Sequence, residues 1–252
     1  MENKGFYDAH GLTDFVPDDL LKDIYDSSKR IMWSIVEYRE MQMLYTCAMK
    51  EITTKLDVLD TEFKVRYKRN PISSVSSRLK RTESIMEKLV SKGYSPSLND
   101  IDRLNDIAGV RVICSYIDDV YAIADALTNQ DDVTLISCKD YIKKPKSNGY
   151  RSLHLIVSVP VFLSETKRNV KVEVQIRTVA MDYWASLEHQ MKYKKEIPDA
   201  PEVEKELCAV AEVMAETDLR MLRLREKIDL AEDEKSEDEE LFERFARIGL
   251  QI

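Results

Sequence analysis

The chain of 252 residues is poor in the residues that mark several classes of protein. It has only six glycines, seven prolines and four cysteines. The cysteines stand singly, without a Cys-x-x-Cys pair, so we expect reduced thiols rather than a zinc knuckle or a disulfide framework. No apolar run reaches about 18 residues, and the N-terminus lacks a basic stretch followed by an apolar one. We therefore expect a cytoplasmic protein with no membrane span.

Basic residues are outnumbered, because the chain has 46 acidic residues against 38 basic ones and a formal net charge of -8. This balance excludes a general nucleic-acid coat, which needs a broad basic surface. Basic residues nevertheless gather in two runs, residues 64–81 without a single acid and residues 139–151 with one. A single basic run usually forms a solvated face, but two runs can line one pocket. Such a pocket suits a compact and highly charged ligand, for example a nucleotide polyphosphate.

Helical periodicity precedes a central region of strands. Residues 17–69 carry apolar residues at helical spacing, which predicts two long helices. The segment 118–130 has the same period. Four segments rich in β-branched residues and bounded by turn residues predict strands, namely 106–116, 132–141, 150–159 and 169–178. The predicted fold class is mixed α/β.

The C-terminal part of the chain predicts a long helix with a narrow apolar stripe. The stripe consists of Val203, Leu207, Val210, Met214, Met221, Leu224 and Ile228. It requires a partner helix, either in the N-terminal segment or in a second copy of the chain. The acidic tail that follows predicts a solvated helix or turn without chemistry. We divide the chain into an N-terminal helical segment (1–69), a core (70–195) and C-terminal helices (196–252), within one compact domain.

Each predicted strand offers one polar face. In the last strand, alternation separates four valines and isoleucines from Glu173, Gln175 and Arg177. Arg111 and His154 take the polar positions of two other strands. An ordinary sheet with one solvated side gives the same alternation. The mixture of charges beside two basic runs, however, indicates a functional site.

Common phosphate-binding loops are missing. The sequence contains neither G-x-x-x-x-G-K-[ST] nor G-x-G-x-x-G, so side chains must hold any phosphates. A magnesium ion is then expected to help neutralise them, bound by one or two carboxylates, phosphate oxygens and water. Asp106 and Glu173 are the candidate ligands, although an aspartate at a strand start is often a cap or turn residue.

The chain resembles the synthetase domain of RelA/SpoT proteins in four stretches: SRLKRTESIMEKL, LNDIAGVRVI, DYIKKPKSNGYRSLH and VEVQIRTVAMDYWASLEHQMKYK. The resemblance covers roughly residues 70–195, and the flanking helices are similar to those of the short, single-domain small alarmone synthetases. It implies a nucleotidyltransferase-like mixed β-sheet flanked by helices. It also implies magnesium-dependent transfer of the pyrophosphate of ATP to the 3′-hydroxyl of GDP or GTP. The products would be AMP and ppGpp or pppGpp, the signals of the stringent response.

For ATP, the resemblance implies four binding residues. Arg78 and Arg111 look like the pair that sandwiches the adenine, which suits planar guanidinium groups. Lys80 and Lys88 would hold the phosphates of ATP.

For the acceptor nucleotide, the resemblance implies a base contact and several phosphate contacts. Tyr150 would stack on guanine. Lys139, Lys146 and His154 would receive the 5′-phosphates, and Gln175 belongs to the same polar strand face.

For catalysis, the resemblance implies that Asp106 binds magnesium and that Glu173, near both metal and acceptor, takes the proton of the attacking hydroxyl. It further implies a homotetramer, with (p)ppGpp or RNA as possible allosteric ligands. The family's hydrolase domain needs a His-Asp pair, which this sequence lacks, so we expect synthesis without hydrolysis. The chain departs from the family pattern at Ser91 and Ser137, where relatives often carry a basic residue.

Two other interpretations stay open. The chain could be a catalytically silent nucleotide- or RNA-binding module, although recognition of single-stranded RNA would need several exposed aromatic residues and the sequence offers chiefly Tyr150. It could also be a helical scaffold that oligomerises through the C-terminal stripe. The presence of both Asp106 and Glu173 favours the enzyme, because a protein that only binds polyanions has no need of two carboxylates in a basic cleft.

Overall fold

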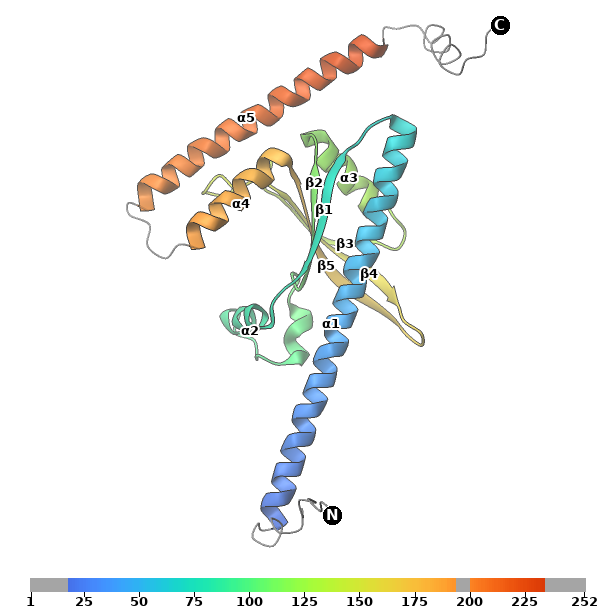
Figure 1. The fold of residues 1–252 in the computed structure, drawn as a ribbon, viewed down its shortest axis with the longest axis vertical. Coiled ribbons are helices and arrows are strands. Elements are labelled where there is room, and N and C mark those ends of the chain that lie inside the picture. Colours follow the sequence, from blue (N-terminus) through green and yellow to red (C-terminus); the bar gives the residue numbers. More distant parts are fainter. Residues whose placement is uncertain (1–17, 194–199, 234–252) are drawn as a thin grey trace, which may run out of the picture.

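The computed structural model describes residues 18–193 and 200–233, and Figure 1 shows their arrangement. Five strands form one mixed sheet in the order β1-β2-β5-β4-β3, in which only the β2–β5 pair is parallel. The elements are α1 (Asp18–Tyr67), β1 (Ile72–Leu79), α2 (Thr82–Ser91), the 3-10 helix η3 (Leu98–Arg103), β2 (Ala108–Cys114), α3 (Ile117–Thr128), β3 (Thr134–Asp140), β4 (Leu153–Phe162), β5 (Lys167–Thr178), α4 (Val179–Tyr193) and α5 (Ala200–Asp233).

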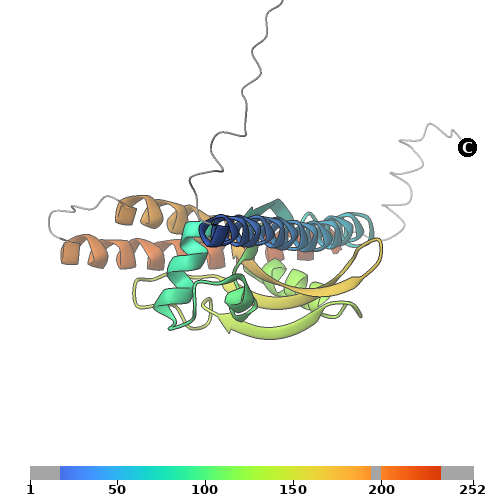
Figure 2. The same ribbon diagram turned by 90° about the horizontal axis from the view of Figure 1, so that it is seen from below.

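The N-terminal segment forms one helix of 50 residues, so the prediction of two helices is wrong. No glycine or proline occurs among residues 18–67, so neither of the strongest helix breakers ends the helix early. The second half of α1 contributes fully buried Ile52 and Leu56 to the core, and Figure 2 shows this helix against the sheet. The first half extends beyond the sheet, and its Met32 and Trp33 are exposed.

The apolar face of the sheet packs against α1 and α3. Val110, Val112, Val172 and Val174 are all buried in this core, as their alternation with polar residues predicts. All four predicted strands are present. The edge strand β1 was not predicted, because its sequence ISSVSSRL is rich in serine and most of its side chains are exposed.

The first basic run is divided between structural ion pairs and the polar face of the sheet. Lys64 pairs with Asp60 one turn earlier in α1, and Arg69 contacts both Asp118 and Asp119 of α3. These residues of the run therefore do not line a pocket. Only its last part, in and after β1, reaches the polar face.

Helix α5 packs on α4 and α3, and α1 is not among the elements with which it makes extensive contact. Leu207 and Val210, in the first half of the stripe, pack beside buried Trp184 of α4. In the second half, Leu224 is 52% exposed and Ile228 is 59% exposed. The C-terminal half of the stripe thus remains uncovered by the described residues, which leaves the second-copy alternative open.

Several other predictions can be compared with the described residues. None of the helices within 18–193 and 200–233 is long and apolar enough to cross a membrane. All four cysteines are free thiols, as predicted. The acidic tail after residue 233 and the segments 1–17 and 194–199 lie outside the described residues. The division of the chain at residues 69 and 195 stays a prediction.

Candidate functional site

A row of polar side chains crosses all five strands on the face opposite α1 and α3. Strand register places Ser76, Arg111, Gln175, His154 and Lys139 side by side, from β1 through β2, β5 and β4 to β3. Directly paired residues of neighbouring strands project from the same face of a sheet. The sheet therefore gathers residues that lie up to about a hundred positions apart along the chain.

A second row lies next to the first and contains a gap. Arg78 of β1 pairs with Gly109 of β2, which in turn pairs with Glu173 of β5. Because Gly109 has no side chain, the space between the side chains of Arg78 and Glu173 is left open. A cavity of about 350 Å³ opens here, within the usual size range of ligand sites. It is lined by Ser76, Ser77, Arg78, Lys80, Asp106, Gly109, Val110, Arg111, Glu173 and Gln175.

Asp106 is held at the edge of this cavity by two lysines. The ammonium groups of Lys80 and Lys88 donate to its Oδ2 atom at 2.9 and 2.5 Å. Burial alone would raise the pKa of Asp106, but the hydrogen bonds and charges of the two lysines outweigh burial and hold the pKa below its ordinary value of 3.8. The other carboxylate oxygen, Oδ1, is buried and has no hydrogen-bond partner among the described residues. Asp106 is therefore ionised, with one oxygen free to bind a cation.

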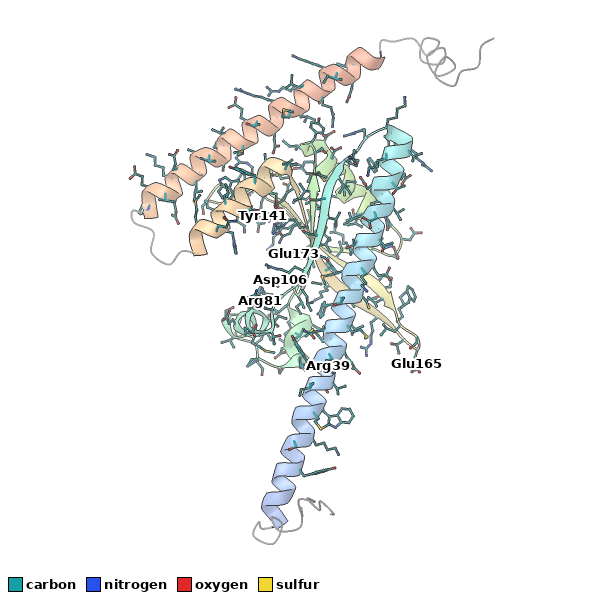
Figure 3. All side chains as sticks on the ribbon, viewed as in Figure 1. Arg39, Arg81, Asp106, Tyr141, Glu165 and Glu173 are labelled. Carbon is teal, nitrogen blue, oxygen red and sulfur yellow. The ribbon has the colours of Figure 1, made fainter. Side chains whose placement is uncertain are left out.

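Glu173 faces the same cavity, and Figure 3 shows it beside Asp106. Gln175 Nε2 donates to its Oε2 atom at 2.8 Å, and His154 Nδ1 lies 3.5 Å from its Oε1 atom. Burial alone would raise the pKa of Glu173, but His154 and Gln175 together lower it below its ordinary value of 4.5. The groups that lower the pKa are thus a histidine and an amide on the same sheet face.

The two carboxylates fit a magnesium ion only as part of a shared coordination shell. Within the described parts of the chain, no group of three or more His, Cys, Asp and Glu residues could hold a metal. Magnesium usually binds through one or two carboxylates and completes its shell with phosphate oxygens and water. The unpartnered Oδ1 of Asp106 suits such an ion.

An aromatic cluster adjoins the cavity on the β4 side. The hydroxyl of Tyr150 lies 2.8 Å from His154 Nε2, which links the tyrosine to Glu173 through the histidine ring. The Lys146 ammonium lies 4.7 Å from the ring centroids of both Tyr141 and Tyr150. Three predicted acceptor residues, Lys146, Tyr150 and His154, thus form one connected group.

Arg177 ties this group to the cavity, and its role was missed from the sequence. It donates to Gln175 Oε1 at 2.9 Å and to the Tyr150 hydroxyl, and its guanidinium carbon lies 5.1 Å from the Tyr150 ring centroid. Asp182 of α4 accepts from Arg177 at 3.2 Å and pairs with Arg111 at 3.3 Å. The strand alternation had already placed Arg177 on the polar face, but nothing in the sequence indicated that its side chain is buried.

The second basic run is also divided. Lys139 lies beside His154 in the first row, and Lys146 contacts the tyrosine rings. Lys143 instead lies over the Tyr121 ring and 3.7 Å from Asp140, so it belongs to the outer edge of the sheet. The two runs therefore contribute selected side chains to the site rather than a continuous basic lining.

Comparison with known proteins supports a nucleotide-handling site. A family profile described as "Region found in RelA / SpoT proteins" matches residues 77–198. The GTP pyrophosphokinase YwaC of Bacillus subtilis (strain 168) is 38% identical over 212 residues, which are 84% of this chain and 100% of that protein. The crystal structure of small alarmone synthetase 2 from Bacillus subtilis has a TM-score of 0.68 and 39% identity, over 76% of this chain and 99% of that chain. Small alarmone synthetase 1 of the same organism, crystallised with its product pppGpp, has a TM-score of 0.69 and 33% identity, over 76% and 98% of the two chains.

Proposed function

Because the chain belongs to the RelA/SpoT family, we propose that it is a GTP pyrophosphokinase that transfers the pyrophosphate of ATP to the 3′-hydroxyl of GDP or GTP. The products are AMP and ppGpp or pppGpp. The observation that carries this proposal is the cavity in which Asp106 and Glu173 meet Arg78, Lys80 and Arg111. Such a cavity combines cations for phosphates with carboxylates for a metal and a proton. A silent binding module, the alternative, has no use for the two carboxylates.

The donor nucleotide occupies the β1–β2 side of the cavity in this proposal. Arg78 pairs with Gly109 on the neighbouring strand, and Arg111 lies two residues beyond Gly109. This spacing suits two guanidinium groups that enclose an adenine ring. Lys80 and Lys88 bind the phosphates of ATP. Both lysines already converge on Asp106, so their positive charge is concentrated where the phosphates and a metal ion would lie.

The acceptor nucleotide occupies the β5–β4–β3 side. Tyr150 stacks on guanine, which displaces the Lys146 ammonium from the face of the ring toward the 5′-phosphates. Lys139, Lys146 and His154 then surround these phosphates. Gln175 lies between the two nucleotides, in contact with Glu173.

Glu173 takes the proton of the attacking 3′-hydroxyl. The hydroxyl oxygen bonds to the β-phosphorus of ATP, the bond between this phosphorus and the α-β bridging oxygen breaks, and AMP leaves. The lowered pKa of Glu173 keeps it ionised and ready to accept a proton at neutral pH. Asp106, together with Glu173, would hold magnesium. When bound, the ion neutralises charge on the transferred phosphates.

We also propose a homo-oligomer, a tetramer as in the family pattern, that covers the exposed half of the α5 stripe. Met221, Leu224 and Ile228 recur by three and four residues and are all exposed, which suits a helix–helix contact between copies. The cytoplasm, which holds both ATP and guanine nucleotides, is the proposed location. Allosteric binding of (p)ppGpp or RNA remains a further proposal. Light scattering tests the assembly, and a monomer mass at micromolar concentration would contradict it.

Product analysis tests the proposed reaction. The protein is incubated with magnesium, ATP labelled in its γ-phosphate, and either GDP or GTP, and the nucleotides are separated. The proposal predicts label in ppGpp or pppGpp together with an equal amount of AMP. Nucleotide binding without transfer would instead support the silent binding module, and formation of ADP would point to a different phosphoryl transfer.

A further inference from the structure

Helix α5 rests on the loop that carries Tyr150, although the two are far apart in the sequence. We name residues 146–151 the acceptor loop, since it presents Lys146 and Tyr150 to the sheet face. Tyr150 packs in a small cluster with Trp184 of α4 and with Leu207, Val210 and Ala211 of α5. The C-terminal helix thus contributes to the back of the acceptor site.

Two small residues meet where the loop and the helix pack together. Gly149 has a φ of +86°, a conformation that favours glycine, and a Cβ atom added to it would lie 2.6 Å from the Cβ of Ala211. The same atom would lie 3.5 Å from the Cα of Cys208, so the loop backbone runs directly against the helix. A larger side chain at position 211 must therefore push the loop away.

Hydrogen bonds fix the same contact. Arg151 donates to the carbonyl oxygens of Gly149 and Ala211 at 3.1 and 3.2 Å, and to Glu212 at 2.8 Å. The Cys208 thiol donates to the carbonyl oxygen of Ser147 at 3.4 Å. One arginine thus ties the loop backbone to the helix backbone on one side, and a thiol does so on the other.

The helix is anchored to the body of the protein independently of the loop. Trp184 of α4 donates to the Leu207 carbonyl at 2.9 Å, and Thr178 at the end of β5 donates to buried Asp218 at 2.6 Å. Farther along, Arg225 pairs with Asp118 of α3 at 2.7 Å. Because α5 is held at three points outside the loop, it can impose a position on the loop rather than follow it.

We propose that α5 positions the acceptor loop, and that Ala211 and Arg151 are positioning residues for GDP or GTP. Their contacts with Gly149 hold the loop backbone where the Tyr150 hydroxyl reaches His154 and Lys146 lies over the Tyr150 ring. None of these groups is among the residues that line the ATP side of the cavity, which β1 and β2 build. This inference rests on the proposed function, and it assigns a selective role in acceptor binding to the C-terminal helix.

The test compares Ala211→Leu with Ala209→Leu, the same substitution at an exposed position of the same helix. Steady-state kinetics give KM for GDP or GTP, KM for ATP and kcat, and calorimetry gives the affinity for GDP alone. Ala211→Leu should raise the acceptor KM and weaken GDP binding about tenfold or more, since small displacements of binding groups have large effects. KM for ATP should stay within about twofold of its original value. Ala209→Leu should change neither constant.

Equal acceptor constants in Ala211→Leu and the unmodified protein would overturn the inference, as would a parallel rise of both KM values. If Ala211→Leu fails to fold, Arg151→Met decides, because it removes the hydrogen bonds without adding volume at the contact. An unchanged GDP affinity in folded Arg151→Met would then overturn the inference. Failure of the proposed reaction is distinguishable, because the unmodified protein would then bind GDP without forming (p)ppGpp.

Discussion

Replacement of Arg177 by methionine should both destabilise the protein and weaken acceptor binding. The arginine side chain is only 5% exposed and donates to Ser152, Asp182, Gln175 and Tyr150. Methionine fills a similar volume but makes none of these hydrogen bonds. Asp182 would then keep Arg111 as its remaining ion-pair partner, and Tyr150 would lose the hydrogen bond that links it to Gln175.

The size of the effect follows from the surroundings of Asp182. Removal of one member of a buried ion pair costs about 3–5 kcal/mol of unfolding free energy. Asp182 is 27% exposed and keeps Arg111 as an ion-pair partner, so its charge is partly compensated and the lower end of the range applies. A loss of about 3 kcal/mol in a protein of this size corresponds to a decrease in Tm of about 6–12 °C.

Thermal unfolding of Arg177→Met and of Arg168→Met measures this effect. Arg168 lies on the same strand but is exposed, so its replacement is the matched control and should change Tm by little. A double-mutant cycle with Asp182→Asn separates the ion pair from the other contacts. A Tm within about 2 °C of the unmodified protein, with an unchanged KM for GDP, would refute the assigned role of Arg177.

Two further predictions concern residues of the cavity. Tyr150→Ala should weaken GDP binding by about 1–3 kcal/mol, the usual contribution of a stacked aromatic side chain, while ATP affinity barely moves; equal losses for both nucleotides would indicate a structural tyrosine. The folded-state pKa of Asp106 lies below its ordinary value of 3.8. The ionised carboxylate therefore stabilises the protein at pH values above this ordinary pKa. This stabilisation is lost as the pH falls through the folded-state pKa. The difference in unfolding free energy between the unmodified protein and Asp106→Asn should therefore shrink below about pH 4, and a constant difference down to about pH 2 would contradict the ion pairs with Lys80 and Lys88.

Much of the fold could be predicted from the sequence because alternation and helical spacing are local signals. Four strands, the mixed α/β class and the RelA/SpoT resemblance are confirmed. The edge strand β1 was missed because serine gives no strong signal for a strand, and its pairing with β2 is a tertiary effect. Two helices were predicted where the structure has the single long α1, because helical periodicity indicates a helix without fixing its length.

The candidate site was predicted less completely than the fold. The polar residues of the strands could be assigned to one face, but their order across the sheet depends on strand order, which places β5 between β2 and β4. Arg177 and Asp182 were missed because their importance lies in burial and in mutual contact. The contact between Gly149 and Ala211 joins positions about 60 residues apart in the chain, and no local pattern indicates it.

The most direct test of the account is the turnover of Glu173→Gln beside Glu165→Gln. Figure 3 shows Glu165 at the far end of the β4–β5 hairpin, so the control makes the same chemical change away from the cavity. With magnesium, ATP and GDP or GTP all saturating, Glu173→Gln should form (p)ppGpp about 10²–10⁴-fold more slowly, because glutamine keeps the size of the side chain but cannot accept the proton. Both nucleotides should still bind, and Glu165→Gln should turn over normally. If Glu173→Gln formed (p)ppGpp at nearly the rate of the unmodified protein, the result would contradict the claim that Glu173, on the polar face of the sheet, removes the proton.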